Sequence, residues 1–225
     1  MKPTFIWIFA ILAAVGFIAL PFLVLERAPL AYELYFNYNI FYYHVPAATM
    51  MFVSAFVCGI GAIGYLVTRK ASWDDLAAAG GDLTVIFGAI VMTTGPIWGK
   101  NAWGTWWVWD ARLTQSLLLW MIFIAYALVR RYGGPGSSRL SAGLAVFGMV
   151  DVPLVYFAVN FWKTQHPTNN VVPTLGPGMR EAFYTGMFAY LFLYIVLLAA
   201  RRGVRAGERR IAAAHDLAAD TGLVT

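Results

Sequence analysis

The chain has 225 residues, of which 60% are hydrophobic and 12% charged, and its formal net charge is +5. A soluble domain of this composition would expose large apolar patches, so the composition excludes a soluble protein and predicts an integral membrane protein. The single cysteine, Cys58, excludes a disulfide framework and a cysteine-based metal site.

Six apolar segments predict an all-α bundle of six transmembrane helices. Five segments can cross a hydrocarbon core of about 30 Å at 1.5 Å per residue, and one is shorter. Lipid cannot satisfy backbone amides, and the alternation of barrel strands is absent, so each segment is predicted to be a helix. The first is expected to be a retained helix, because no small-residue cleavage site follows it. The segments are Phe5 to Leu25, His44 to Thr68, the shorter Leu83 to Trp98, Leu113 to Val129, Leu140 to Phe161 and Ala182 to Ala200.

The cations predict the orientation of these helices. Cytoplasmic loops are rich in Lys and Arg, and eleven of the sixteen cations fall on the side that holds both termini. We therefore expect a multi-pass membrane protein with both termini cytoplasmic. The positive charge then needs no nucleic-acid partner, although it suits contact with anionic membrane lipid. The eleven are Lys2, Arg69, Lys70, Arg130, Arg131, Arg139, Arg201, Arg202, Arg205, Arg209 and Arg210; the five are Arg27, Lys100, Arg112, Lys163 and Arg180.

This topology divides the chain into a membrane domain, residues 1–200, and a basic cytoplasmic tail, residues 201–225. The predicted outer loops are 26–43, 99–112 and 162–181, and the predicted inner loops are 69–81 and 130–139. The end of the tail, 211–225, is alanine-rich and weakly amphipathic, which is typical of a membrane-surface or disordered end. The aromatic, moderately long outer loops indicate that the working surface is outside.

Two of the three histidines share the outer side. His44 begins the second helix and His166 lies in the last outer loop, whereas His215 is in the tail. Either one alone could be an ordinary polar residue of the interface. Two neutral imidazoles facing each other would suit an iron porphyrin as axial ligands. Zinc fits less well, because only carboxylates such as Glu33, Asp110 or Glu181 could complete its ligand set.

Residues 98–112 contain five tryptophans, Trp98, Trp103, Trp106, Trp107 and Trp109. An interfacial anchoring belt explains isolated tryptophans, but explains this crowding less well. If the segment is helical, Trp103, Trp106, Trp107 and Asp110 share one face, which could hold a flat apolar ring. Gly99 and Gly104 would admit close approach of the backbone, and Lys100 and Arg112 could meet propionates or lipid headgroups.

The string Trp98-Gly-Lys-Asn-Ala-Trp-Gly-Thr-Trp-Trp-Val-Trp-Asp-Ala-Arg-Leu-Thr114 lies between Tyr43-His-Val-Pro-Ala-Ala48 and Trp162-Lys-Thr-Gln-His166. Together the three closely resemble the haem exporter protein C family (CcmC) of cytochrome c maturation. That family belongs to the haem-handling membrane proteins named for a WWD motif. The likeness covers all six spans in order.

The resemblance implies a haem-transfer protein rather than an enzyme. It implies that one haem b (iron protoporphyrin IX) binds transiently at the outer face of a bacterial inner membrane and is delivered to the haem chaperone CcmE. The implied partners are the ATP-binding-cassette pair CcmA and CcmB and the small subunit CcmD. By position, His44 and His166 match the axial ligands and Arg112 a functionally important arginine. Trp103, Trp106, Trp107, Trp109 and Asp110 match the haem-facing motif.

One residue departs from the family pattern. Many members have an arginine where this chain has Asn39, five residues before His44. The missing cation puts a propionate contact in doubt on that side, and Lys163 or Arg180 could replace it.

Other motifs have plainer interpretations. Gly59-Ile-Gly-Ala-Ile-Gly64 satisfies a dinucleotide-binding pattern, but it lies inside an apolar segment and predicts helix packing. Asp151 is an intramembrane acid beside Pro153, and either ligand handling or a buried hydrogen bond would explain it. Cys58 is expected to be a small packing residue.

The sequence contains no Ser-His-Asp set, no paired-carboxylate site and no phosphate loop, so energy for transport is expected to come from a partner. Two alternative functions remain open. A cytochrome b-like redox subunit would normally need a second haem, for which only His215 remains. A haem-free scaffold subunit of an ABC exporter would show no haem absorption.

Overall fold

The computed structural model describes residues 3–28, 36–134, 136–168 and 171–221. These residues form six long helices and two short 3₁₀ helices, with no strand in the described ranges. The long helices are α1 (Pro3–Glu26), α2 (Phe41–Thr68), α3 (Ala71–Trp103), α4 (Ala111–Tyr132), α5 (Ser137–Phe161) and α6 (Pro177–Asp220); the short ones are η1 (Phe36–Ile40) and η2 (Val172–Thr174). All six long helices are long and apolar enough to cross a membrane, which confirms the predicted all-α, six-span fold.

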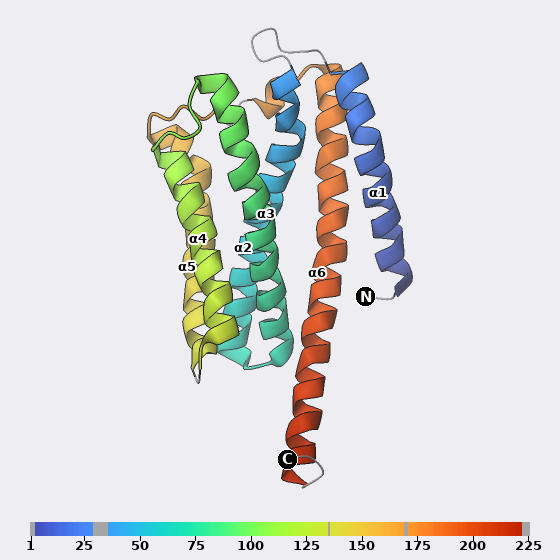
Figure 1. Ribbon diagram of the computed structural model, residues 1–225, viewed down its shortest axis with the longest axis vertical. Helices are drawn as coiled ribbons and strands as arrows, with labels where there is room; N and C mark the ends of the chain where they lie inside the picture. The colour runs from blue at the N-terminus through green and yellow to red at the C-terminus, as the bar shows by residue number, and fades with distance from the viewer. Residues whose placement is uncertain (1–2, 29–35, 135, 169–170, 222–225) are drawn as a thin grey trace.

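The helices stand side by side with alternating direction (Figure 1). Helix α2 packs against α3 and α5, and α4 packs against α5 and α3, whereas α1 packs mainly against α6. Close packing between α2 and α3 depends on small residues: a Cβ added at Gly61 would lie 2.6 Å from the backbone nitrogen of Ala77. The glycines of the dinucleotide-like pattern therefore serve helix packing, as predicted, and Cys58 is fully buried beside them.

Sharp turns separate neighbouring helices at one end of the bundle. Arg69 takes the left-handed conformation (φ 57°) that ends α2, and α3 begins two residues later. Gly136 (φ 91°) similarly precedes α5. We call this end, where α6 also finishes, the tail end, and the opposite end, where α2 begins and α3 finishes, the cavity end.

Helix α3 is longer than predicted, and the predicted inner loop 69–81 is wrong. Residues 71–81 form about three further helical turns, although they contain Asp74 and Asp75. Arginines from other helices pair with these acids. Arg130 of α4 donates two hydrogen bonds to Asp74, at 2.7 and 2.8 Å, and Arg209 of α6 pairs with Asp75. The ion pairs explain how a polar segment joins an apolar helix.

The tail is also a continuation of a helix. Helix α6 has 44 residues, so it is about 66 Å long at 1.5 Å per residue, far more than a hydrocarbon core of about 30 Å. Its last third projects beyond the other helices (Figure 1). Arg201 and Arg205 pair with Asp82 of α3 at 2.6 and 3.1 Å, which ties this extension to the bundle. The prediction of a disordered end is therefore wrong for residues up to Asp220, whereas contact of the tail with the membrane surface stays a prediction; residues 222–225 lie outside the described ranges.

Candidate functional site

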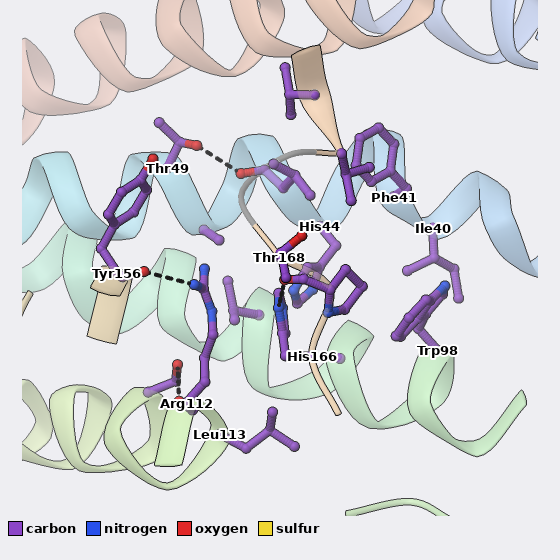
Figure 2. Close-up of a pocket in the computed structure, with 18 of the residues that line it drawn as sticks. Ile40, Phe41, His44, Thr49, Trp98, Arg112, Leu113, Tyr156, His166 and Thr168 are labelled. Carbon is purple, nitrogen blue, oxygen red and sulfur yellow. Dashed lines mark hydrogen bonds between the residues drawn. The ribbon is translucent and has the colours of Figure 1, made fainter. Parts of the chain in front are cut away.

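The cavity end contains a large, mostly apolar cavity of about 800 Å³. Its wall is formed by helices α2 to α6, by η1, and by the segments before α4 and before α6, and aromatic and aliphatic side chains dominate it. His44, Arg112 and His166 are the basic side chains that its lining brings together among the described residues (Figure 2). Concave apolar sites with a few convergent polar groups are typical of ligand-binding sites.

His44 lies in the first turn of α2 and is held by α3. Its Nδ1 is 2.8 Å from Oγ1 of Thr94, and the Thr94 hydroxyl donates its proton to the Ile90 carbonyl at 2.7 Å. A hydroxyl has one proton, so Thr94 can only accept from His44, whose Nδ1 must carry the hydrogen. In the neutral ring, Nε2 then has a free lone pair, which is the form that binds a metal.

His166 lies in the segment between α5 and α6 and has the same tautomer. Its Nδ1 is 2.8 Å from the Pro167 carbonyl oxygen, which can only accept, so Nδ1 donates and Nε2 keeps its lone pair. Burial, followed by the nearby Arg112 guanidinium, lowers the pKa of His166 from 6.5 to about 4. The ring is therefore neutral at pH 7 and able to bind a metal.

The chain from Trp103 to Asp110 does not form one helix, so the predicted common face of Trp103, Trp106, Trp107 and Asp110 is wrong. Helix α3 continues to Trp103 and ends at Gly104, whose φ of 76° is accessible to glycine at little cost. Residues 104–110 form bends and irregular chain before α4 begins at Ala111. A Cβ at Gly104 would meet nothing within 4 Å, so the positive φ, and not close packing, explains why glycine is needed at this position.

The irregular chain divides the tryptophans into two groups. Trp98, Trp103 and Trp107 line the cavity, and the rings of Trp98 and Trp103 pack edge to face at 5.2 Å. Trp107 Nε1 is buried without a hydrogen-bond partner among the described residues, so it is a donor that a ligand could use. Trp106 and Trp109 are 58% and 75% exposed and lie outside the lining.

Asp110 connects two parts of the site instead of lining the cavity. Its Oδ1 accepts a hydrogen bond from the backbone N–H of Leu113 at 2.9 Å, which caps the first turn of α4. Its Oδ2 accepts one from the backbone N–H of Gln165, also at 2.9 Å. Asp110 therefore attaches the residue next to His166 to the start of α4.

Arg112 is the cation that lines the cavity. Its guanidinium donates to the Tyr156 carbonyl of α5 at 3.1 Å and leaves other N–H groups for a ligand (Figure 2). Lys100 is exposed and donates to the Gly104 carbonyl at 3.0 Å. Neither Lys163 nor Arg180 lines the cavity, and Arg180 donates to the Leu175 carbonyl at 3.0 Å.

The remaining candidates lie elsewhere or serve the structure. His215 is exposed near the tail end, remote from the other two histidines. Asp151 is buried in α5, and its Oδ2 has no partner in the described part of the chain. Among the described residues no three His, Cys, Asp or Glu side chains form a metal-binding group; Glu33, one of the zinc candidates, lies outside the described ranges.

Several residues of the site had no signal in the sequence. Thr94 is hydrogen-bonded to His44, which lies fifty residues away in the chain, and the sequence around Thr94 is that of an ordinary apolar helix. Phe41 and Tyr156 line the cavity as aromatic residues of ordinary membrane helices. Only the packing of α2 against α3 and α5 reveals them.

Comparison with known proteins shows the family to which the chain belongs. The family model described as heme exporter protein C (CcmC) matches residues 1–215. The heme exporter protein C of Escherichia coli (strain K12) is 32% identical over 173 residues, which cover 76% of this chain and 71% of that protein. The heme exporter protein C of Haemophilus influenzae is 30% identical over 207 residues, or 89% and 82% of the two chains. A putative cytochrome c biosynthesis ccmC-like mitochondrial protein of Arabidopsis thaliana is 31% identical over 150 residues, or 67% and 57%. The chain therefore belongs to the heme exporter protein C family of cytochrome c biogenesis.

Proposed function

We propose that the cavity binds one haem b as transported cargo, with the iron between Nε2 of His44 and Nε2 of His166. The single observation that carries the proposal is the matched presentation of the two imidazoles. Both line one cavity, and each has its Nδ1 occupied by an acceptor. Metal-binding histidines characteristically donate their second ring nitrogen in this way.

The rest of the cavity fits the porphyrin. Its apolar wall suits the ring, and Trp98, Trp103 and Trp107 offer large apolar surfaces for packing. The Arg112 guanidinium and Trp107 Nε1 supply donors that suit propionate oxygens. In this account Trp106, Trp109 and Lys100, which lie outside the lining, act at the mouth of the cavity or at the membrane interface.

We further propose that the cavity end faces the periplasm and that the haem passes from it to the chaperone CcmE. Support comes from the cation distribution and from family membership. We expect the protein to act in a complex with CcmA, CcmB and CcmD, because its sequence contains no phosphate loop that could couple ATP hydrolysis to transport. Its own residues bind the cargo, orient it and exclude water.

The test uses the wild type, His44→Ala and His166→Ala, with His215→Ala as the matched control. We expect the purified wild type and His215→Ala to show the Soret band of a six-coordinate haem and to load co-expressed CcmE with covalent haem. Each of the other two variants should have an altered Soret band and reduced loading. Unchanged spectra and full loading in both would refute the ligand assignment, and a wild type without haem absorption would favour the scaffold function.

A further inference from the structure

The contact between α2 and α3 at the cavity end holds His44 in one orientation. The Thr94 hydroxyl gives its single proton to the Ile90 carbonyl and can therefore act only as an acceptor for His44 Nδ1. Rotation of the ring by half a turn would place a C–H group against that oxygen and lose the hydrogen bond. The contact therefore fixes both the tautomer of His44 and the edge of its ring that points into the cavity.

The residue after Thr94 supports the same geometry. A Cβ built at Gly95 would lie 3.3 Å from Cε1 of His44, tighter than most real contacts of this kind. Glycine therefore leaves room for the imidazole against the backbone of α3. The ring is confined between a hydroxyl and a bare stretch of helix, both supplied by consecutive residues.

The two histidines are held in different ways. His166 donates to the carbonyl of its own neighbour, Pro167, so its ring orientation is set within the segment between α5 and α6. His44 donates to a side chain of another membrane helix. Its orientation therefore depends on one replaceable side chain.

We infer that Thr94 is a positioning residue for haem: it keeps the proton of His44 on Nδ1 and aims Nε2 at the iron. This inference rests on the proposed haem site and deepens it by assigning how one ligand is controlled. A hydrogen bond to the far nitrogen also raises the basicity of an imidazole ligand. Thr94 thus strengthens the iron–His44 bond without touching the haem iron.

The test compares Thr94→Val, which keeps the shape and removes the acceptor, with Thr94→Ser, which keeps the hydroxyl. Thr93→Val is the matched control, because Thr93 is exposed and, among the described residues, its hydroxyl bonds only to the Ala89 carbonyl of its own helix. Haem affinity, the low-spin ferric spectrum and the reduction potential of bound haem are measured for each. Loss of a hydrogen bond of this type typically weakens metal binding by about 10- to 100-fold.

We expect Thr94→Val to bind haem at least about tenfold more weakly, to show a partly high-spin spectrum and to have a raised reduction potential. Thr94→Ser and Thr93→Val should match the wild type. Wild-type affinity, spectrum and potential in Thr94→Val would overturn the inference.

A second measurement tests Thr94 without haem. Nitrogen NMR of the histidine rings in the haem-free protein should show His44 as the Nδ1–H tautomer in the wild type and as a mixture in Thr94→Val. An Nε2–H tautomer in the wild type would overturn the inference. Failure of the proposed function is distinguishable, because it would appear as an unchanged haem spectrum in His44→Ala.

Discussion

Replacement of Asp110 tests whether this carboxylate acts through His166. Asp110 makes two hydrogen bonds, one that caps α4 and one to the backbone N–H of Gln165. Serine is a good helix cap but has one side-chain oxygen, so Asp110→Ser keeps the cap and removes the link to Gln165. The variant isolates the loop attachment from the stability of α4.

The expected effect follows from the lost bond. Hydrogen bonds to charged groups contribute about 1.5–3 kcal/mol, and the exposure of Gln165 places this one at the low end. A loss of about 1.4 kcal/mol is tenfold in an equilibrium constant, so the docked position of His166 should be about tenfold less favoured. Haem affinity should fall by a similar factor.

Haem titration in a double-mutant cycle gives the measurement. Asp110→Ser should weaken binding about tenfold in the wild-type background and less than about twofold in the His166→Ala background, because the ligand it positions is already absent. Equal losses in both backgrounds would show that Asp110 contacts haem directly, and our reasoning about its role would be refuted.

Three further predictions concern other parts of the structure. The pKa of His166 is lowered to about 4, so this ring should stay neutral in the folded, haem-free protein at pH values where the unfolded chain already binds a proton. The contribution of His166 to the free energy of unfolding should therefore fall as the pH drops from 6.5 towards 4. A titration of the His166 ring by NMR with a midpoint near 6.5 would contradict this. Gly95→Ala should displace the His44 ring by a few tenths of an ångström and reduce haem affinity several-fold, whereas unchanged affinity would show that the contact is unimportant. Asp74→Asn should lower the free energy of unfolding in detergent by about 1–2 kcal/mol, because it disrupts the bidentate ion pair with Arg130. The haem spectrum should stay unchanged, since this ion pair lies at the tail end.

The sequence predicted those features that depend on local pattern. Long apolar segments gave six helices, and the topology they imply correctly placed His44 and His166 at one end of the bundle. The crowding of tryptophans predicted an aromatic surface near the histidines, and Trp98, Trp103 and Trp107 line the same cavity as His44 and His166.

The sequence could not predict features that depend on contacts between distant segments. Residues 71–81 looked like a loop because the arginines that neutralise Asp74 and Asp75 lie more than fifty residues away. The prediction of a helical face of tryptophans was wrong because Gly104, with its positive φ, ends α3 within the tryptophan segment. The roles of Asp110 and Thr94 likewise require the folded positions of Gln165 and His44.

Low-temperature electron paramagnetic resonance of the ferric haem-loaded protein tests the central claim most directly. We predict the low-spin signal of iron with two imidazole ligands in the wild type, and its loss in both His44→Ala and His166→Ala. A high-spin signal in the wild type, or a low-spin signal that survives in the protein with both histidines replaced, would contradict the account.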